Sequence, residues 1–194
     1  MKNERLLYLG LLGLLLFVAR KELRTQKAAE VGALAYFQPS DFGEWWPVMN
    51  ADLVRKVDAL ANEALKYGYY VMISPAFGAI GRVYDTADSN DSSRHNVTKW
   101  GEVQALDIMV FQLDALGDHV SLAAGQASLF LSDINAQGFG GVGVYPFWKP
   151  FSGFHVDVRP HKADGTIATW GDVGQFGQHK YVALSEGMSK WGLA

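Results

Sequence analysis

Hydrophobic and polar positions divide the chain into an apolar N-terminal stretch and a longer region in which helix and strand patterns mix. Residues 6–19 read LLYLGLLGLLLFVA, an uninterrupted apolar run of 14 residues with charged residues on both sides. As a helix the run would be about 21 Å long at about 1.5 Å per residue. This is short for a hydrocarbon core of about 30 Å, although flanking arginines can extend their charged ends to the lipid surface.

Three interpretations of this run remain open. It can be a buried core helix, a cleaved signal peptide or an uncleaved membrane anchor. The signal peptide fits in length, but the residue two positions before Ala19 is Phe17, where cleavage sites carry a small residue. We therefore expect an anchor helix and linker over residues 1–35 and a second domain over residues 36–194. The positive charges after the run outnumber those before it, which would keep that side cytoplasmic.

The second domain shows both helix and strand patterns. After Asn50, a helix cap, apolar residues recur at helical spacing as far as Leu65, and Gly68 ends the helix. A second helix is expected over residues 121–136, capped by Ser121 and closed by Gly138. The expected strands and short elements cover residues 69–74, 105–111, 140–146, 154–158 and 169–171, with a short helix near the C-terminus.

The segment FHVDVR over residues 154–159 alternates apolar and polar side chains. Alternation predicts a strand with Phe154 on one face and His155 and Asp157 on the other. The Cα atoms of His155 and Asp157 would then lie about 6–7 Å apart. This arrangement suits a metal ligand next to a proton acceptor.

Two further residues are candidates for the same centre. Residues 76–99 form a long polar stretch, and such loops in compact domains are usually functional or disordered. This stretch carries His95, so we interpret it as functional. Asp107 lies in an otherwise apolar run, and a buried carboxylate needs a partner or a metal. His95, Asp107 and His155 can supply the three ligands of a catalytic zinc, although a single histidine is more often a surface or core residue.

Composition excludes several classes of function. The chain is 49% hydrophobic and 19% charged, which is typical of a globular protein, and its net charge of −3 gives no reason to expect nucleic acid as a partner. The absence of cysteine excludes disulfides, thiolate zinc sites and cysteine nucleophiles. The glycines of residues 140–143 lack the strand-to-helix setting of a nucleotide-binding loop. No helix-borne glutamate suggests the paired carboxylates of a glycosidase.

Two groups of residues carry a family resemblance. Ser93-x-His95, Gly101 and Ala105-x-Asp107 resemble the S-x-H-x-x-G-x-A-x-D pattern of M15-type zinc D,D- and L,D-peptidases. The segments GGVGVYP (140–146) and FHVD (154–157), with the later Trp170, are similar to the murein endopeptidase branch of that group. Two positions depart from the pattern. Eleven residues separate His95 from Asp107, more than in the pattern, and Ser152 stands where many members have a catalytic Glu or Asp.

The resemblance implies a fold and a metal. It implies an α+β domain in which helices pack against a small, mostly antiparallel sheet, as in hedgehog-type and D,D-peptidase domains. It implies Zn²⁺ held by His95, Asp107 and His155. The expected partner is peptidoglycan, in which an amide bond of a stem or crosslink peptide would be hydrolysed.

The resemblance also suggests roles for residues around the metal. Asp157 is the candidate base, or with equal weight the group that fixes the imidazole of the neighbouring ligand. Arg82 is the candidate for binding a substrate carboxylate or polarising the scissile carbonyl, with Arg94 and Arg159 as rivals. Trp170 is expected to line the cleft or to lie in the core.

We therefore expect a membrane-anchored zinc metallopeptidase that degrades the cell wall, acting in the periplasm and envelope or as a virion-associated phage lysis enzyme. The competing interpretation is an inactive peptidase-like structural or wall-binding component of a virion or envelope. Ser152 and the long His95–Asp107 spacing favour the competing interpretation. His119, His161 and His179 have no matching context, and we expect them at the surface.

Overall fold

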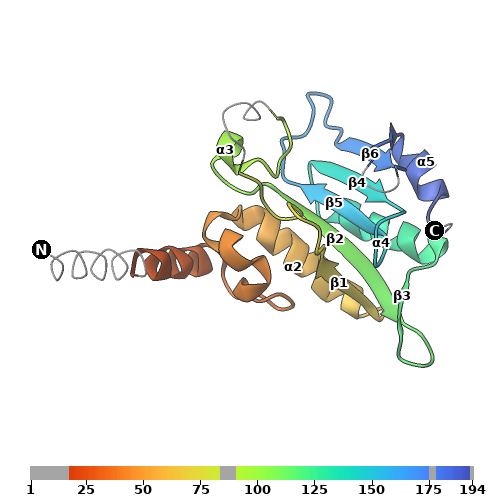
Figure 1. The fold of residues 1–194 in the computed structure, drawn as a ribbon, viewed down its shortest axis with the longest axis horizontal. Coiled ribbons are helices and arrows are strands. Elements are labelled where there is room, and N and C mark those ends of the chain that lie inside the picture. Colours follow the sequence, from red (N-terminus) through yellow and green to blue (C-terminus); the bar gives the residue numbers. More distant parts are fainter. Residues whose placement is uncertain (1–17, 84–90, 175–177, 193–194) are drawn as a thin grey trace, which may run out of the picture.

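The computed structural model describes residues 18–83, 91–174 and 178–192 (Figure 1). The expected anchor run lies almost wholly within residues 1–17, outside the described residues. Residues 18–31 are helical. Within the described ranges, no helix combines the length and the apolar character needed to cross a membrane.

The remaining elements mix helices and strands. The helices are η1 (Pro39–Val48, 3₁₀), α2 (Ala51–Leu65), α3 (Val97–Trp100), α4 (Ala124–Ala136) and α5 (Leu184–Ser189). The strands are β1 (Tyr69–Ile73), β2 (Ala105–Leu113), β3 (His119–Ser121), β4 (Gly141–Tyr145), β5 (Gly153–Asp157), β6 (Ala168–Asp172) and β7 (Tyr181–Val182).

The strands form one seven-stranded sheet in the order β1-β2-β5-β4-β6-β7, with β3 paired to β2. Every pairing is antiparallel except the parallel pair β4–β6. The α+β fold with packed helices and a mostly antiparallel sheet is thus confirmed.

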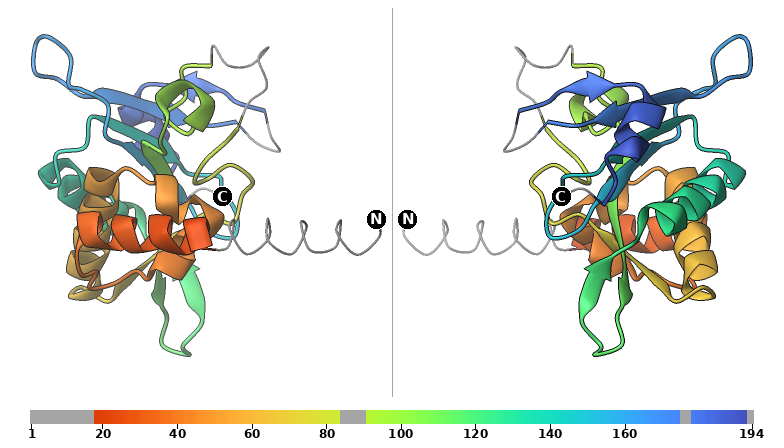
Figure 2. Two further views of the ribbon diagram at one scale, coloured as in Figure 1. Left: turned by 90° about the vertical axis from the view of Figure 1, so that its left-hand side faces the viewer. Right: turned by 90° about the vertical axis from the view of Figure 1, so that its right-hand side faces the viewer.

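Helices cover one face of the sheet, and the loop that follows β1 lies on the opposite side (Figure 2). The ring of Phe154 in β5 lies 5.5 Å from that of Phe130 in α4 and 4.9 Å from that of Trp191. Val144 in β4 lies on the same face, next to Gly187 of α5. The predicted alternation in residues 154–158 is therefore confirmed, with Phe154 in the core and His155 on the face away from the helices.

The first predicted helix is confirmed, and the second begins later than expected. The side chain of Asn50 accepts a hydrogen bond from the amide of Leu53 at 3.0 Å and so caps α2. Ser121 does not cap α4, because it pairs with Phe111 as the last residue of β3. The helix instead begins at Ala124, where Gln126 accepts the N–H of residue 123 at 2.8 Å.

The segment before η1 is tied to α2. Asp58, which is buried in α2, accepts hydrogen bonds at 2.9 Å from the amides of Ala35, Tyr36 and Phe37. The indole of Trp46 donates to the carbonyl of residue 24 at 3.2 Å, so the helix over residues 18–31 also contacts the domain. The boundary at residue 36 remains a prediction.

Candidate metal centre

One row of residues crosses four strands on the face away from the helices. In this row Asp107 of β2 pairs with His155 of β5, His155 pairs with Gly143 of β4, and Gly143 pairs with Trp170 of β6. Directly paired side chains in a sheet lie about 4.5–5.5 Å apart at Cβ, so the pairing alone brings Asp107 and His155 together. Residues far apart in the chain therefore meet because of the strand register.

His95 reaches this row from the long loop after β1. Its Nδ1 lies 2.8 Å from the carbonyl oxygen of Ile80, and its own carbonyl accepts the amide of Arg82 at 2.8 Å. Both the ring and the backbone of His95 are thus hydrogen-bonded to the segment of residues 80–82. This leaves Nε2 of His95 directed at the sheet.

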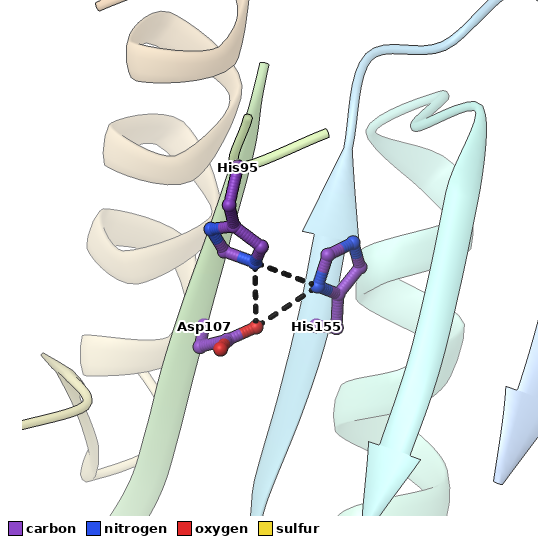
Figure 3. Close-up of side chains that lie close together, drawn as sticks. All are labelled: His95, Asp107 and His155. Carbon is purple, nitrogen blue, oxygen red and sulfur yellow. Dashed lines mark hydrogen bonds and ion pairs between the residues drawn. The ribbon is translucent and has the colours of Figure 1, made fainter. Parts of the chain in front are cut away.

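The three candidate ligands converge, and their side chains point toward one another (Figure 3). Oδ1 of Asp107 lies 2.9 Å from Nδ1 of His155 and 3.2 Å from Nε2 of His95. The two nitrogens are 3.2 Å apart. Ligand atoms on a tetrahedral zinc at about 2.0–2.1 Å lie roughly 3.3 Å from each other, so these separations suit a small cation. All three residues are buried.

Hydrogen bonding at the outer nitrogens supports a cation at this point. A carbonyl oxygen only accepts, so Nδ1 of His95 carries its proton, and Nε2 presents an electron pair. Nε2 of His155 lies 3.1 Å from a carboxylate oxygen of Asp157, so it donates and Nδ1 presents an electron pair. Two electron pairs and a carboxylate oxygen therefore face one another, which is favourable only around a positive charge.

The electrostatics of the centre agree with this arrangement. Burial lowers the pKa of His155, but hydrogen bonds to Asp107 and Asp157 outweigh burial and raise that pKa to about 9. Burial raises the pKa of Asp107, but the charges and hydrogen bonds of the two imidazoles outweigh it and hold that pKa below its usual value. The centre thus keeps its carboxylate ionised and attracts a positive charge, either a proton or a metal ion.

Asp157 lies behind His155, away from the open side of the centre. Its side chain is fully buried, and it binds Nε2 of His155 and the guanidinium of Arg159, with Nε of Arg159 at 2.8 Å. Burial raises the pKa of Asp157, but these two partners hold it below its usual value. Asp157 is not among the described residues that line the cavity in front of the ligands. These contacts favour the orienting role of Asp157 over that of a base.

Two glycines of the GGVGVYP segment make room for this arrangement. A Cβ atom at Gly141 would overlap the carboxylate of Asp157. A Cβ atom at Gly143 would lie 2.5 Å from the indole of Trp170. Because Gly143 has no side chain, Trp170 extends across β4, and its ring centre lies 5.0 Å from that of His155. The glycines therefore allow close packing around the candidate metal ligands.

The centre opens into a cavity of about 540 Å³. Besides the three ligands, its charged and aromatic lining comprises Arg82, Asp91, Arg94, Arg159, Tyr145, Trp148, Trp170, His179 and Tyr181. Cavities of about 300–1,000 Å³ are typical of small-ligand sites. The predicted site residues Arg82 and Trp170 thus lie on the same cavity as the three ligands, together with the rivals Arg94 and Arg159.

Sequence patterns did not indicate three polar residues at or near this cavity. Tyr145 is buried, and its hydroxyl accepts the indole N–H of Trp170 at 3.1 Å. His179 was expected at the surface, and its side chain is indeed 63% exposed, but it lines the cavity and pairs with Asp172. No local motif marks His179 or Asp172. Tyr145 could have been found from the sequence, because it lies near the end of the glycine-rich segment that carries the family resemblance.

No match to this chain was found among models of protein families, curated proteins or solved structures. The geometry of the candidate metal centre and its cavity is therefore the basis for a functional proposal.

Proposed function

We propose that this chain is a zinc-dependent peptidase that hydrolyses an amide bond in bacterial peptidoglycan. The observation that carries the proposal is the convergence of His95, Asp107 and His155 at the wall of an open cavity. Two imidazoles and one carboxylate, with space for a further ligand, are typical donors of a catalytic zinc. Zinc held there would act as a Lewis acid and lower the pKa of water to about 7.

The lining of the cavity supports a peptide substrate with free carboxylates. Arg82, Arg94 and Arg159 bring positive charge to the cavity. Stem peptides of the cell wall carry such carboxylates, and arginine binds them with two parallel hydrogen bonds. The choice of peptidoglycan rests on the resemblance of residues 140–157 to murein endopeptidases.

Tyr145 is suited to stabilise charge on the scissile carbonyl oxygen. Its hydroxyl oxygen accepts a hydrogen bond from Trp170, so its own hydrogen remains for an acceptor in the cavity. Burial, together with the charge of Asp107, raises the pKa of Tyr145 well above its usual value, so the phenol stays protonated. Preorganised donors of this kind lower the barrier to acyl transfer. Arg82 remains the second candidate for this role.

One observation favours the alternative of an inactive domain. Ser152 is buried and donates its hydroxyl hydrogen to the carbonyl of Pro146 at 2.7 Å, so it cannot accept a proton from water. The inactive alternative therefore holds unless another residue of the cavity takes that proton. The expected anchor over residues 1–35 would place either protein at a membrane, in the cell envelope or in a virion.

The test is digestion of purified peptidoglycan by the full-length chain, with metal analysis and mass spectrometry of the fragments. We expect about one zinc per chain and release of peptide fragments. His155→Ala should lose both zinc and cleavage, while His161→Ala, at an exposed histidine, should keep both. Zinc binding without any fragment would support the inactive alternative, and a chain that binds no zinc would overturn the proposal.

A further inference from the structure

A second pair of polar side chains lies at the same cavity as the candidate metal centre. Nδ1 of His179 lies 2.6 Å from Oδ2 of Asp172, at the end of β6. The carboxylate is 5% exposed and also accepts the amides of Gly174 and Lys180 at 2.9 Å. His179 stacks on Tyr181 of β7, with an angle of 3° between the ring planes. The imidazole is thus fixed on two sides.

Building on the peptidase proposed above, we propose that His179 is the general base and acid of the reaction, held in position by Asp172. Imidazole is the group that most often serves as a general base at neutral pH. A histidine oriented by a buried carboxylate is also the recurring arrangement in enzymes that transfer protons from water or a hydroxyl. The catalytic residue is His179, and Asp172 is a positioning residue.

The hydrogen bond to Asp172 defines which nitrogen is available. Burial raises the pKa of Asp172, but its three hydrogen bonds hold that pKa below the usual value, so the group is a carboxylate and can only accept. Nδ1 of His179 therefore carries the proton, and Nε2, on the far side of the ring from Asp172, presents an electron pair. Nε2 is the atom that accepts a proton from water.

The position of the pair relative to the metal ligands supports the role. Trp170 lies two residues before Asp172 in β6, and its ring packs 5.0 Å from that of His155. Asp172 pairs with Tyr181 of β7, and Tyr181 lines the same cavity as the three candidate ligands. His179 and the three ligands line one cavity.

The other candidates for a base are less suitable. Ser152 donates to a backbone carbonyl, and Asp157 is buried behind His155 in contact with Arg159. Asp91 lines the cavity, but its Oδ1 already accepts the amide of Ser93 at 2.8 Å. Among the described residues of the lining, His179 combines an available nitrogen with a fixed ring.

Hydrolysis by this route needs only water and the peptide as reactants. The oxygen of water bonds to the carbonyl carbon, and one water hydrogen passes to Nε2 of His179. As the C–N bond breaks, the same proton passes from Nε2 to the departing nitrogen, which leaves as an amine. The second water hydrogen is released when the new carboxyl group ionises.

The decisive variant is His179→Gln, with His161→Gln as the matched control at an exposed histidine outside the cavity. Cleavage of purified peptidoglycan is measured at low and saturating substrate, together with zinc content and thermal unfolding. We expect kcat to fall about 100- to 10,000-fold in His179→Gln, with KM changed less than about threefold and zinc content unchanged. The control should behave as wild type. Because His179 is exposed, the variant is expected to fold.

The positioning role of Asp172 has a readout that is independent of activity. Long-range ¹H–¹⁵N spectra of the imidazole should show His179 as the Nδ1–H tautomer in wild type and a mixture of tautomers in Asp172→Asn. kcat should fall about 10- to 100-fold in Asp172→Asn, less than in His179→Gln. An Nε2–H tautomer in wild type would overturn the assignment.

The outcomes separate this inference from the function on which it depends. If wild type cleaves peptidoglycan and His179→Gln cleaves it within about threefold of the same rate, the base is another group and the peptidase stands. If wild type binds zinc but cleaves nothing, both proposals fail. A fall in zinc content in His179→Gln would make His179 a ligand and would also overturn the inference.

Discussion

Replacing Asp157 by asparagine separates the two roles that this carboxylate can have. In the structure its Oδ2 lies 3.1 Å from Nε2 of His155, and the side chain is fully buried. Asparagine has nearly the same size but no charge, so it no longer selects the tautomer of His155 whose Nδ1 faces Asp107. We therefore expect Asp157→Asn to weaken zinc binding.

The expected size of the loss follows from known partners of metal-binding histidines. Removing such a partner costs about 10- to 100-fold in metal affinity, or about 1.4–2.8 kcal/mol. Competition between zinc and a proton opposes this loss. Asp157 helps to raise the pKa of His155 to about 9, so at about pH 6.5 the imidazole of the wild type is protonated. Zinc must displace this proton, which weakens the zinc affinity of the wild type roughly 300-fold. Asp157→Asn lowers this pKa, so its deficit should be smaller at about pH 6.5 than at about pH 8.5.

The assay is competition for zinc with a chromophoric chelator at both pH values. Arg159→Gln is the matched variant, because it removes the other partner of Asp157 and leaves the contact to His155 in place. It should change zinc affinity less than about threefold. Asp164→Asn, at an exposed carboxylate bonded to Thr166, should have no effect. Thermal unfolding of each variant separates loss of fold from loss of the metal.

One result would refute the orienting role. If Asp157→Asn kept its zinc affinity within about threefold at about pH 8.5 while peptidoglycan cleavage fell more than about 100-fold, Asp157 would be the base. The same result would also contradict the assignment of the base to His179.

Three further predictions concern stability. In the metal-free protein the raised pKa of His155 should stabilise the fold by about 3 kcal/mol below about pH 6.5, and this contribution should disappear as the pH rises through about 9. Urea unfolding with a chelator present measures it, and a free energy of unfolding that does not change over this pH range contradicts the prediction. Gly143→Ala should lower the stability of the fold by about 1–3 kcal/mol, because the added Cβ meets Trp170. Gly125→Ala, with open space around it in α4, should be neutral or stabilising by up to about 1 kcal/mol. Equal effects of the two variants in thermal unfolding would refute this reasoning. Asp58→Ala should cost at least about 3 kcal/mol in chemical denaturation, because three backbone amides lose their acceptor, and a loss below about 1 kcal/mol would show that water replaces it.

Local patterns along the chain were enough to predict part of the fold. The cap at Asn50 and the helical spacing after it predicted α2, because both signals come from neighbouring residues. The alternation around His155 predicted which side chains face the core, because the pleat of a strand alone decides this. The start of α4 was wrong because Ser121 pairs with β2, and this pairing depends on a contact with another strand.

The residues at the cavity that were missed depend on contacts between distant elements. Asp172 and His179 lie on either side of the β6–β7 hairpin, and Asp172 pairs with Tyr181 only because of the register of those two strands. The role of Trp170 likewise depends on the parallel pairing of β6 with β4, which places its ring across Gly143. Neither contact has a periodicity that can be found along the sequence.

The spacing between His95 and Asp107 illustrates why sequence distance is a weak guide to a metal site. Part of the intervening chain folds into α3, which Asn96 caps by accepting the amide of Lys99 at 3.1 Å, and which ends at Gly101 with a φ of 74°. The extra length is thus taken up in a local turn. His95 is held separately: its ring lies against the carbonyl of residue 80, and its own carbonyl accepts the amide of residue 82. Because each ligand is positioned by its own neighbours, added residues between them do not move the ligand atoms apart, and a long spacing does not count against a shared ion.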